Sequence, residues 1–319
     1  YHGGEPLLAG ANFVDFASET IRAAMPAGTN LALSVQTNGV LLDEKMLQTL
    51  ARHDVGIGVS LDGDQTANDR HRRYTNGRGS YHQVAEGLRR LNQPEYRKLF
   101  TMLLCTIDVA NDPVATYESL LRFDPPGIDF LHPHGNWTER PPHRDDDPTK
   151  TPYGDWLAAV FDRWYDAPEQ ETHVRILQSI IDQVLGARGG YGTIGLVVPP
   201  LIDVETDGSM QQNCNLKSTF DGATCTGLNV FAHSFDLAMQ NPLVVASQIG
   251  LPALSDECLG CQIRDICGGG YYPHRYRAGA GFRHRSVYCA DLFRLITHVQ
   301  RRVRIDLDVP DSPDRWSVR

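Results

Sequence analysis

The sequence predicts an α/β fold with a parallel sheet, followed by a smaller, cysteine-rich module. Strand-like and helix-like stretches alternate through the first half of the chain, which indicates parallel strands joined by helices. From Gly195 onward the pattern changes to short strands, glycine-rich turns and cysteines. A Cys-x2-Cys pair with two more cysteines lies within this second part. We therefore expect one domain over residues 1–190 and a second over residues 191–319.

Short apolar or β-branched runs mark the predicted strands of the sheet. About five strands can be counted, so a complete eight-stranded barrel is not expected. In folds of this class the chemistry lies at the carboxyl ends of the strands. The clearest strand segments are Leu31–Val35, Val55–Leu61, Met102–Ile107 and Ile128–Leu131.

Helical patterns separate these strands. Ser80 and Gln83 form a capping-box signal, and Asp112 before Pro113 marks a second helix start. Three later helices are predicted near Asp155–Tyr165, Val174–Leu185 and Ala290–Val303.

Composition narrows the class of protein. The chain has 319 residues, of which 41% are hydrophobic and 22% charged, as in a globular protein with a sizeable core. The apolar runs are too short to span a bilayer. A net charge of −9 argues against a nucleic-acid surface. Seven cysteines, an odd number, favour metal-binding or catalytic thiols in a reducing compartment, so we expect a cytoplasmic protein.

The cysteine spacing is the strongest chemical signal. Cys258, Cys261 and Cys267 follow the pattern C-x2-C-x5-C, and Cys289 comes after 21 further residues. Four thiolates at such spacing can close one metal site. Three glycines, 268–270, would let backbone N–H groups approach the sulfurs. The spacing leaves three alternatives open: an iron–sulfur cluster, a structural zinc ion, or unliganded thiols.

A second signal lies in a turn near the start of the chain. Gly3 and Gly4 would let the backbone wrap closely around a ligand, Glu5 offers an acceptor for an ammonium group, and Pro6 fixes the turn. Small polar residues also follow the next two predicted strands, in Gln36-Thr37-Asn38-Gly39 and Ser60-Leu61-Asp62-Gly63. We expect a polar cofactor to lie across these strand ends.

These motifs occur in the order found in radical SAM enzymes with a C-terminal SPASM domain, which the chain resembles over roughly residues 1–300. The matching stretches are G-G-E-P, QTNGVLL, GVSLDG, NDRHRR with GRGSY, and C-x2-C-x5-C-G-G-G. The stretches HPHGNW, PYGDWLAAVFDRWYD, VETDGS and TGLNVFAHSFD are most similar to the FxsB-like branch. The resemblance implies a partial (β/α)6 TIM-like barrel lacking its first strand, followed by a small SPASM iron–sulfur domain.

The resemblance also implies roles for individual residues. The turn of Gly3, Gly4, Glu5 and Pro6 would hold the amino group of S-adenosylmethionine (SAM). Cys258, Cys261, Cys267 and Cys289 match the ligands of an auxiliary [4Fe–4S] cluster. The other implied SAM contacts are Gln36, Asn38 and Ser60 near the ribose and carboxylate, Arg72 as a bidentate partner of the carboxylate, and Leu131 beside the adenine.

The chain departs from the family pattern at three places. The C-x3-C-x2-C motif of the SAM-cleaving cluster, which precedes the G-G-E-P turn in the family, is absent, so that cluster is expected from a missing N-terminal segment. Tyr271 stands where relatives carry a further cysteine, and we therefore expect one auxiliary cluster rather than two. Counted from Gly208, Asn213 takes the place of a ligand cysteine and Cys214 that of an acidic base. Cys214 is thus a candidate proton acceptor or hydrogen donor, with a bystander thiol as the alternative.

The resemblance implies a radical SAM oxidoreductase that modifies a ribosomally made precursor peptide, with a carbon–carbon, cyclophane-type crosslink as the product. A flavodoxin or ferredoxin would donate electrons, and neither nucleic acid nor membrane is an expected partner. Two alternatives remain open: another SPASM outcome, such as oxidation or epimerisation of a peptide residue, and a zinc-bearing peptide-binding scaffold without catalysis.

Overall fold

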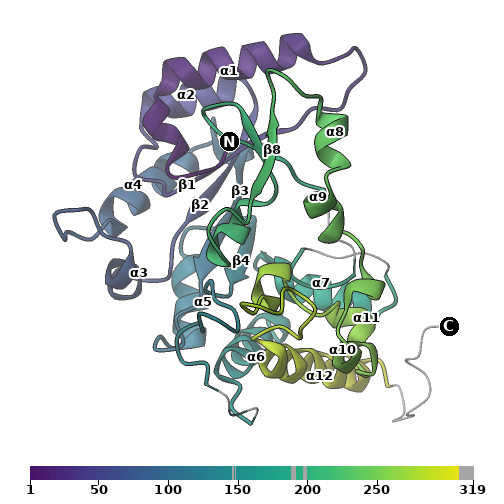
Figure 1. Ribbon diagram of the computed structural model, residues 1–319. Helices are drawn as coiled ribbons and strands as arrows, with labels where there is room; N and C mark the ends of the chain where they lie inside the picture. The colour runs from purple at the N-terminus through teal and green to yellow at the C-terminus, as the bar shows by residue number, and fades with distance from the viewer. Residues whose placement is uncertain (146, 148, 188–191, 197–199, 309–319) are drawn as a thin grey trace. The chain divides into compact units, whose positions relative to one another are not determined.

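The computed structural model describes residues 1–145, 147, 149–187, 192–196 and 200–308 (Figure 1). The chain divides into two compact units, each made of two separate stretches. Unit 1 comprises Tyr1–His132 with Asp162–Arg175, and unit 2 comprises Pro133–Phe161 with Ile176–Arg319.

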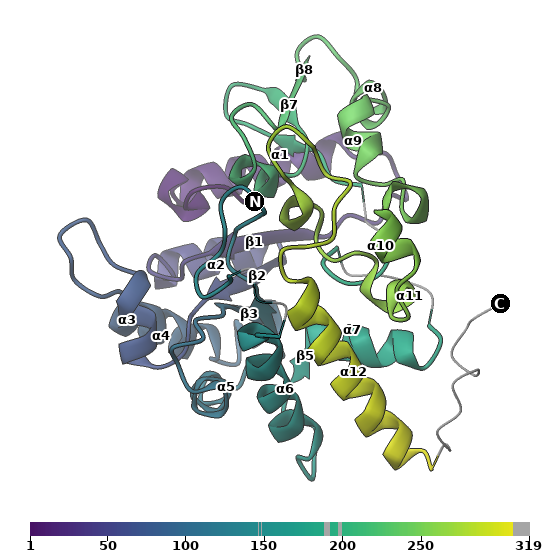
Figure 2. The same cartoon turned by 60° about the horizontal axis from the view of Figure 1, so that its bottom comes forward.

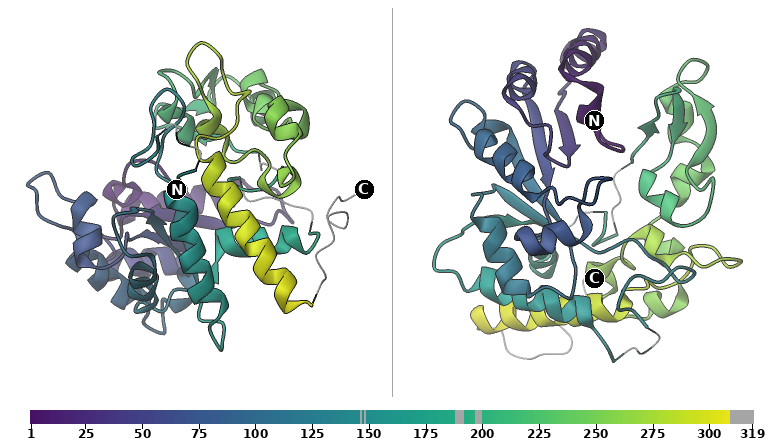
Figure 3. Two further views of the ribbon diagram at one scale, coloured as in Figure 1. Left: turned by 90° about the horizontal axis from the view of Figure 1, so that it is seen from below. Right: turned by 90° about the vertical axis from the view of Figure 1, so that its left-hand side faces the viewer.

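Unit 1 is built on a five-stranded sheet, and all four strand pairings in it are parallel. The strands follow one another in the sheet as they do in the chain, so right-handed crossovers place their connecting helices on one face. Figure 3 shows these helices on the outer side of the curved sheet. The predicted α/β class is confirmed. The strands are β1 (Leu33–Thr37), β2 (Val55–Ser60), β3 (Phe100–Thr106), β4 (Gly127–Leu131) and β5 (His173–Val174).

Aspartates begin three helices of unit 1. Asp43, Asp64 and Asp112 each accept a hydrogen bond from a backbone N–H in the first helical turn, which satisfies a donor that the helix itself leaves unpaired. The start predicted at Asp112 is confirmed. The helices are η1 (Pro6–Ala9), α1 (Ala11–Ala24), α2 (Glu44–Arg52), α3 (Gln65–His71), α4 (Tyr81–Leu91), η2 (Arg97–Leu99) and α5 (Pro113–Leu121).

The capping box predicted at Ser80 is wrong, although α4 does begin at the next residue. The Ser80 side chain caps no N–H of α4. Its hydroxyl donates instead to the carbonyl of Arg72, 3.0 Å away. The Ser80 hydroxyl therefore binds the Arg72 carbonyl instead of the first turn of α4, which the local pattern had predicted as its partner.

Unit 2 contains a three-stranded antiparallel sheet, β6 (Asp203–Val204), β7 (Ser209–Gln211) and β8 (Cys225–Asn229), in that order. Unit 2 also contains several short helices and one long helix. They are η3 (Cys214–Ser218), α8 (Phe235–Met239), α9 (Pro242–Ala246), η4 (Leu251–Ala253), α10 (Asp256–Leu259), α11 (Arg264–Cys267), η5 (Tyr272–Arg275) and α12 (Cys289–Asp306).

The helices α6 (Pro152–Tyr165) and α7 (Arg175–Val184) run across the boundaries between the two units. Within unit 2, α6 starts against α12, as Figure 2 shows. The buried carboxylate of Asp291 in α12 accepts hydrogen bonds from the backbone N–H groups of Tyr153 and Gly154, at 2.9 and 3.0 Å. A Cβ built on Gly154 would lie 2.5 Å from the Asp291 carbonyl oxygen, so only glycine allows this approach. Asp291 thus caps a helix that lies 137 residues earlier in the chain.

No helix among the described residues is both long and apolar enough to cross a membrane.

Candidate cofactor sites

The turn at the start of unit 1 runs alongside β1. The Tyr1 nitrogen donates to Ser34 O, and Gln36 N donates to Tyr1 O, at 2.6 and 3.1 Å, which is the pattern of parallel neighbours. Gly3 has φ +127°, and a Cβ built on Gly3 or Gly4 would meet no atom within 4 Å. The backbone of this turn is therefore open to an approaching ligand.

Glu5 is the side chain that fixes this turn to β1. Its Oε1 accepts from the Thr37 hydroxyl at 2.7 Å and from Leu7 N at 3.0 Å, and its Oε2 accepts from Asn38 N at 2.7 Å. Pro6 occupies the first turn of η1, where its missing N–H costs nothing. The carboxylate is thus held in one position at the end of β1, and Oε2, which accepts one hydrogen bond, has room for a further donor.

Gln36 and Ser60 lie side by side on neighbouring strands, because Gln36 Nε2 donates to Ser60 Oγ at 3.1 Å. Sequence reasoning missed the residue that allows this contact. A Cβ built on Gly58 would lie 2.3 Å from Gln36 Oε1, so the glutamine side chain takes this position only over a glycine. A glycine inside a strand is itself a signal of such a close approach.

Arg72 is paired with Asp62. Its Nε and Nη2 donate to the two Asp62 carboxylate oxygens at 2.5 and 3.2 Å, and the backbone N–H of Thr106 donates to Asp62 Oδ1 at 2.8 Å. The Asp62 side chain is 8% exposed and that of Arg72 27%. We expected Arg72 to meet a ligand carboxylate directly. In the structure its guanidinium instead pairs with Asp62, which follows β2 and also accepts from Thr106 of β3. The Nη1 atom of Arg72 makes no bond to Asp62.

Loss of Asp62 is expected to destabilise the protein. Asp62→Ala removes the partner of Arg72 and of Thr106 N, and hydrogen bonds to charged groups contribute about 1.5–3 kcal/mol each. Because Arg72 keeps partial contact with solvent, we expect a loss of about 2–3 kcal/mol in the free energy of unfolding, measured by urea denaturation. Glu86→Ala removes an exposed carboxylate that pairs with Arg90 and is the control, with a loss below about 1 kcal/mol. Equal losses in the two variants would contradict this prediction.

The other two residues implied for SAM, Asn38 and Leu131, also lie at the carboxyl ends of strands in this sheet. Asn38 follows β1 and is exposed, and its Oδ1 accepts from Val40 N at 2.9 Å, which closes a local turn. Leu131 ends β4, and its carbonyl accepts from Ile107 N at 2.9 Å. Two strands, β2 and β3, separate it from β1. We call Glu5, Gln36, Asn38, Ser60, Arg72 and Leu131, together with the glycine turn, the strand-end site.

The four cysteines of the C-terminal pattern line one cavity of about 120 Å³ in unit 2. Cys258 lies in α10, Cys267 ends α11 and Cys289 begins α12, while Cys261 lies in the turn after α10. We call these four thiols and the space between them the cysteine pocket. The structure therefore brings together residues that are up to 31 positions apart in the sequence.

Burial and the neighbouring thiols disfavour the charged form of two of these cysteines, Cys267 and Cys289. Burial, followed by the proximity of Cys289, raises the pKa of Cys267 to about 12. Burial, followed by the proximity of Cys258, raises the pKa of Cys289 to about 11. The Gly269 N–H contacts the Cys267 sulfur and opposes this shift, as expected of a glycine beside a thiolate ligand.

The spacing of the thiols bears on the kind of group that the pocket fits. A single zinc ion holds four sulfurs at about 2.3 Å from itself, hence about 3.8 Å from one another. Among the described residues, no three of the cysteine sulfurs lie within 4.8 Å of one another. A cubane cluster has an iron at each of four corners, so its thiolates stand farther apart than those around one ion. The pocket thus fits a cluster better than a zinc ion.

The glycines after Cys267 are required by the backbone. Gly268, Gly269 and Gly270 all have positive φ, between 61° and 79°. Their three carbonyls converge on the buried guanidinium of Arg275, which donates to them at 2.6–3.2 Å. The contact between Arg275 and these glycines was not predicted from the sequence, and no local sequence pattern indicates it.

Cys214 begins η3 next to Asp203, whose carboxylate accepts from the Cys214 backbone N–H at 2.5 Å. Burial and, after it, the Asp203 charge raise the pKa of the Cys214 thiol to about 11. Such a thiol is a poor proton acceptor at neutral pH but can still donate a hydrogen atom. Of the two roles considered for Cys214, the surroundings favour hydrogen donation.

The two positions at which the resemblance leads one to expect extra cluster ligands lie together. Asn213 Nδ2 donates to the Tyr271 hydroxyl at 3.3 Å. Burial raises the pKa of this phenol to about 12, so it stays neutral at physiological pH. A hydrogen-bonded polar pair therefore stands where two cysteines would be needed.

Comparison with known proteins places part of the chain in a described family. Residues 1–117 match the family model described as the radical SAM superfamily. The chain contains a radical SAM domain. Its radical SAM domain accounts for α1–α4, β1–β3 and most of α5, and hence for the Glu5, Gln36, Ser60 and Arg72 positions of the strand-end site.

The chain is also homologous to anaerobic sulfatase-maturating enzymes. It is 23% identical to the serine-type enzyme of Klebsiella aerogenes, over 95% of this chain and 72% of that protein. It is 24% identical to the cysteine-type enzyme of Clostridium perfringens (strain 13 / Type A), over 66% of this chain and 57% of that protein. The FxsB-like assignment stays a prediction, because these relatives do not test it.

A solved structure, native anSMEcpe with bound AdoMet and Cp18Cys peptide, has the same fold. It superposes with a TM-score of 0.81 at 19% identity and covers 97% of this chain and 85% of that chain.

Proposed function

We propose that this radical SAM protein binds SAM at the strand-end site and one [4Fe–4S] cluster in the cysteine pocket, and that it modifies a peptide. The observation that carries the proposal is the cysteine pocket: four thiols share one cavity, at a spacing wider than a single ion needs. The Asn213–Tyr271 pair supports one auxiliary cluster rather than two, since neither residue is a thiolate.

The strand-end site suits the amino-acid end of SAM. The fixed carboxylate of Glu5 offers a charged acceptor to the ammonium group, and the open glycine backbone allows a close approach. Arg72 would reach the ligand carboxylate through Nη1 while its other nitrogens stay on Asp62. Gln36 and Ser60, already hydrogen-bonded to each other, would present polar atoms to the ribose.

With a reduced iron–sulfur cluster, bound SAM supplies an organic radical that abstracts a hydrogen atom from the substrate. The residues of the strand-end site would orient SAM. Because its thiol stays protonated at neutral pH, we assign Cys214 the return of a hydrogen atom to the peptide radical in the epimerisation alternative, after which the electron donor and a proton restore the thiol from its thiyl radical. Formation of a crosslink returns no hydrogen atom to the peptide, and there the thiol would only shield the radical. A flavodoxin or ferredoxin is the proposed electron donor.

The proposed product is a carbon–carbon crosslink in a ribosomally made precursor peptide, on the strength of the FxsB-like stretches. The second candidate is the maturation of a sulfatase, favoured by the names of the homologues. Product analysis separates the two. A crosslinked peptide loses two hydrogens and resists fragmentation between the linked residues, whereas an oxidised serine or cysteine becomes a carbonyl that hydrazide reagents label.

The test uses the full-length protein, reconstituted with iron and sulfide, with SAM, a reductant and two peptides. One is a precursor peptide with aromatic residues, and the other is a sulfatase-derived peptide with a serine or cysteine target. A crosslink in the first supports the proposal, and carbonyl formation in the second replaces it with sulfatase maturation. Cleavage of SAM with neither peptide changed would overturn both assignments of substrate.

Cys214→Ala is expected to leave 5′-deoxyadenosine release intact and to block modification of the peptide, because the peptide radical loses the side chain that would shield it or return a hydrogen atom to it. Both quantities are measured on the same samples. Cys225→Ala, which removes an exposed thiol of β8, is the control and should behave as the wild type. Normal modification by Cys214→Ala would show that this thiol is a bystander.

A further inference from the structure

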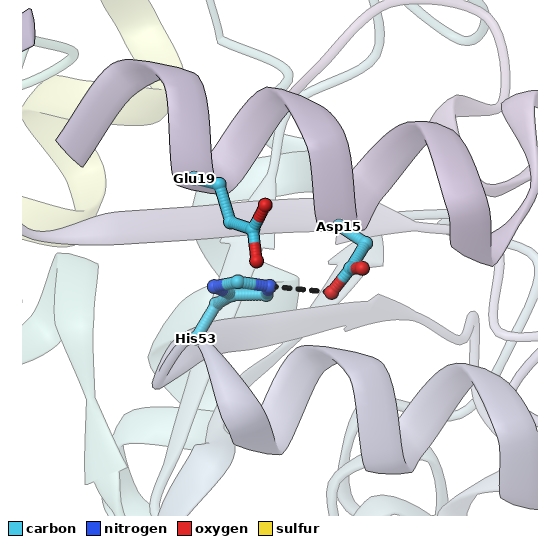
Figure 4. Close-up of side chains that lie close together, drawn as sticks. All are labelled: Asp15, Glu19 and His53. Carbon is cyan, nitrogen blue, oxygen red and sulfur yellow. Dashed lines mark hydrogen bonds and ion pairs between the residues drawn. The ribbon is translucent and has the colours of Figure 1, made fainter. Parts of the chain in front are cut away.

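A cluster of metal-ligating side chains lies in unit 1 between α1 and the end of α2. Asp15 and Glu19 are four residues apart, on one face of α1, and His53 is the C-cap of α2 (Figure 4). One ligand atom from each residue lies within 4.8 Å of the other two. His53 precedes β2, so the cluster lies toward the amino end of that strand, at the opposite end from Ser60 and Asp62.

Part of this cluster has a structural explanation. His53 Nε2 and Asp15 Oδ1 are 2.7 Å apart, and the His53 side chain is 7% exposed, so the pair holds α1 against α2. Arg52 Nη1 lies 2.6 Å from the same Asp15 oxygen. The hydrogen bond with His53 is the largest cause of a lowered pKa at Asp15, so this carboxyl is ionised at neutral pH.

Glu19 is not explained by that pair. Its carboxylate lies within 4.8 Å of Asp15 and His53, yet within the described part of the chain it makes no hydrogen bond or ion pair. Two carboxylates at this distance repel each other unless a cation lies between them. Arg52 neutralises only Asp15, and its side chain is 59% exposed, so it can leave at little cost.

We propose that Asp15, Glu19 and His53 bind one divalent transition-metal ion, with water in the remaining positions. One imidazole nitrogen and two carboxylate oxygens suit zinc or manganese. They suit less well the ions that prefer sulfur ligands, such as Cu(I). Ligand atoms around zinc stand about 3.4 Å apart, given metal–ligand distances near 2.1 Å. Glu19 is exposed and reaches such a position by a change of rotamer.

Binding of a metal ion requires two changes in the hydrogen bonds of Asp15 and His53. Arg52 must leave Asp15, and the proton that His53 Nε2 shares with Asp15 must move to Nδ1, so that Nε2 offers its lone pair. Arg22 already donates to the His53 backbone carbonyl and holds that end of α2 in place. The bound ion would join α1 to α2 and stabilise this edge of unit 1.

The test measures Mn²⁺ binding to the full-length protein with its iron–sulfur clusters in place. Mn²⁺ is the first probe because it binds thiolates weakly, so the cysteine pocket does not interfere. After equilibrium dialysis, elemental analysis is expected to find one manganese ion per chain. Zn²⁺ is the second probe, and it should raise the thermal unfolding midpoint of the wild type.

Glu19→Gln is the decisive variant, because it leaves the Asp15–His53 contact intact and disturbs no other bond of the described chain. Its affinity for Mn²⁺ should fall at least 10-fold, since even residues that only support a metal ligand are worth about 10–100-fold. Glu169→Gln, at an exposed carboxylate of unit 1, is the matched control. Arg52→Ala should bind at least as tightly as the wild type.

Three results would overturn the proposal: no stoichiometric Mn²⁺ in the wild type, equal affinity in Glu19→Gln and the wild type, or weaker binding by Arg52→Ala. In the first two cases the Asp15–His53 pair is only a contact between helices. In the third, the Arg52 guanidinium helps to build the cluster, and an anion or no ligand at all would be its occupant.

Discussion

Replacing Cys267 by alanine is expected to remove one whole cluster from the protein. The variant should lose about four iron and four sulfide atoms per chain relative to the wild type, together with part of the visible absorbance, because Cys267 is one of the four thiolates proposed to hold this cluster. The thermal unfolding midpoint should fall as well, since the free energy of metal binding contributes to folding. Iron, labile sulfide and zinc are counted on anaerobically reconstituted samples.

The control for Cys267→Ala is Cys105→Ala. Cys105 is a buried thiol of β3 in unit 1, and it does not line the cysteine pocket. Its loss should cost some stability but no iron or sulfide. One zinc ion per chain, lost in Cys267→Ala without any change in sulfide, would refute the cluster and restore the zinc alternative. Unchanged iron in Cys267→Ala would refute the four-thiolate site.

Replacing Glu5 by alanine is expected to weaken SAM binding about 10- to 150-fold, because a hydrogen bond to a charged group is worth about 1.5–3 kcal/mol. Glu5 has the central place in this prediction because the structure fixes its carboxylate through Thr37 and Asn38 at the end of β1. Calorimetry on the full-length protein measures the dissociation constant.

A lower affinity could also follow from local disorder of the turn. Glu5→Gln addresses this, since it keeps the side-chain shape and the acceptor for Thr37 and Leu7 but removes the charge and the hydrogen bond from Asn38 N. It should lose most of the affinity while losing less stability than Glu5→Ala, as measured by urea denaturation. Glu86→Ala, on the exposed surface of α4, is the matched control and should bind SAM as the wild type does. Unchanged affinity in Glu5→Ala would remove Glu5 from the SAM site.

Local patterns predicted the sheet of unit 1 well. The four strand segments named from the sequence agree with β1–β4 to within two residues at each end, and the helix start at Asp112 is confirmed. These features depend on side-chain alternation and on caps within one turn, which neighbouring residues encode. The capping box at Ser80 failed because a carbonyl eight residues earlier, that of Arg72, competed for the hydroxyl.

The contacts that the sequence could not predict follow no local spacing rule. Asp291 caps α6 across 137 or more residues, so the contact depends on where the backbone brings distant segments. Arg72 pairs with Asp62, and Arg275 binds three glycine carbonyls, within short stretches of chain whose irregular backbone no helix or strand pattern describes. The candidate sites were named mainly by resemblance. What the structure adds is that the four cysteines of the C-terminal pattern line one cavity and that Gln36 contacts Ser60.

The cap that Asp291 provides for α6 has a consequence for the order in which the chain folds. The N–H groups of Tyr153 and Gly154 at the start of α6 have their acceptor in α12, 137 or more residues later in the chain. During synthesis, α6 emerges from the ribosome long before its partner, and its first turn must hydrogen-bond to water in the meantime. The β1–β4 pairings of unit 1 need no residue beyond Leu131, so they can form while the rest of the chain is still being made. Unit 2 can close only after α12 has been synthesised, which makes its assembly, and with it the cysteine pocket, later than that of the β1–β4 sheet.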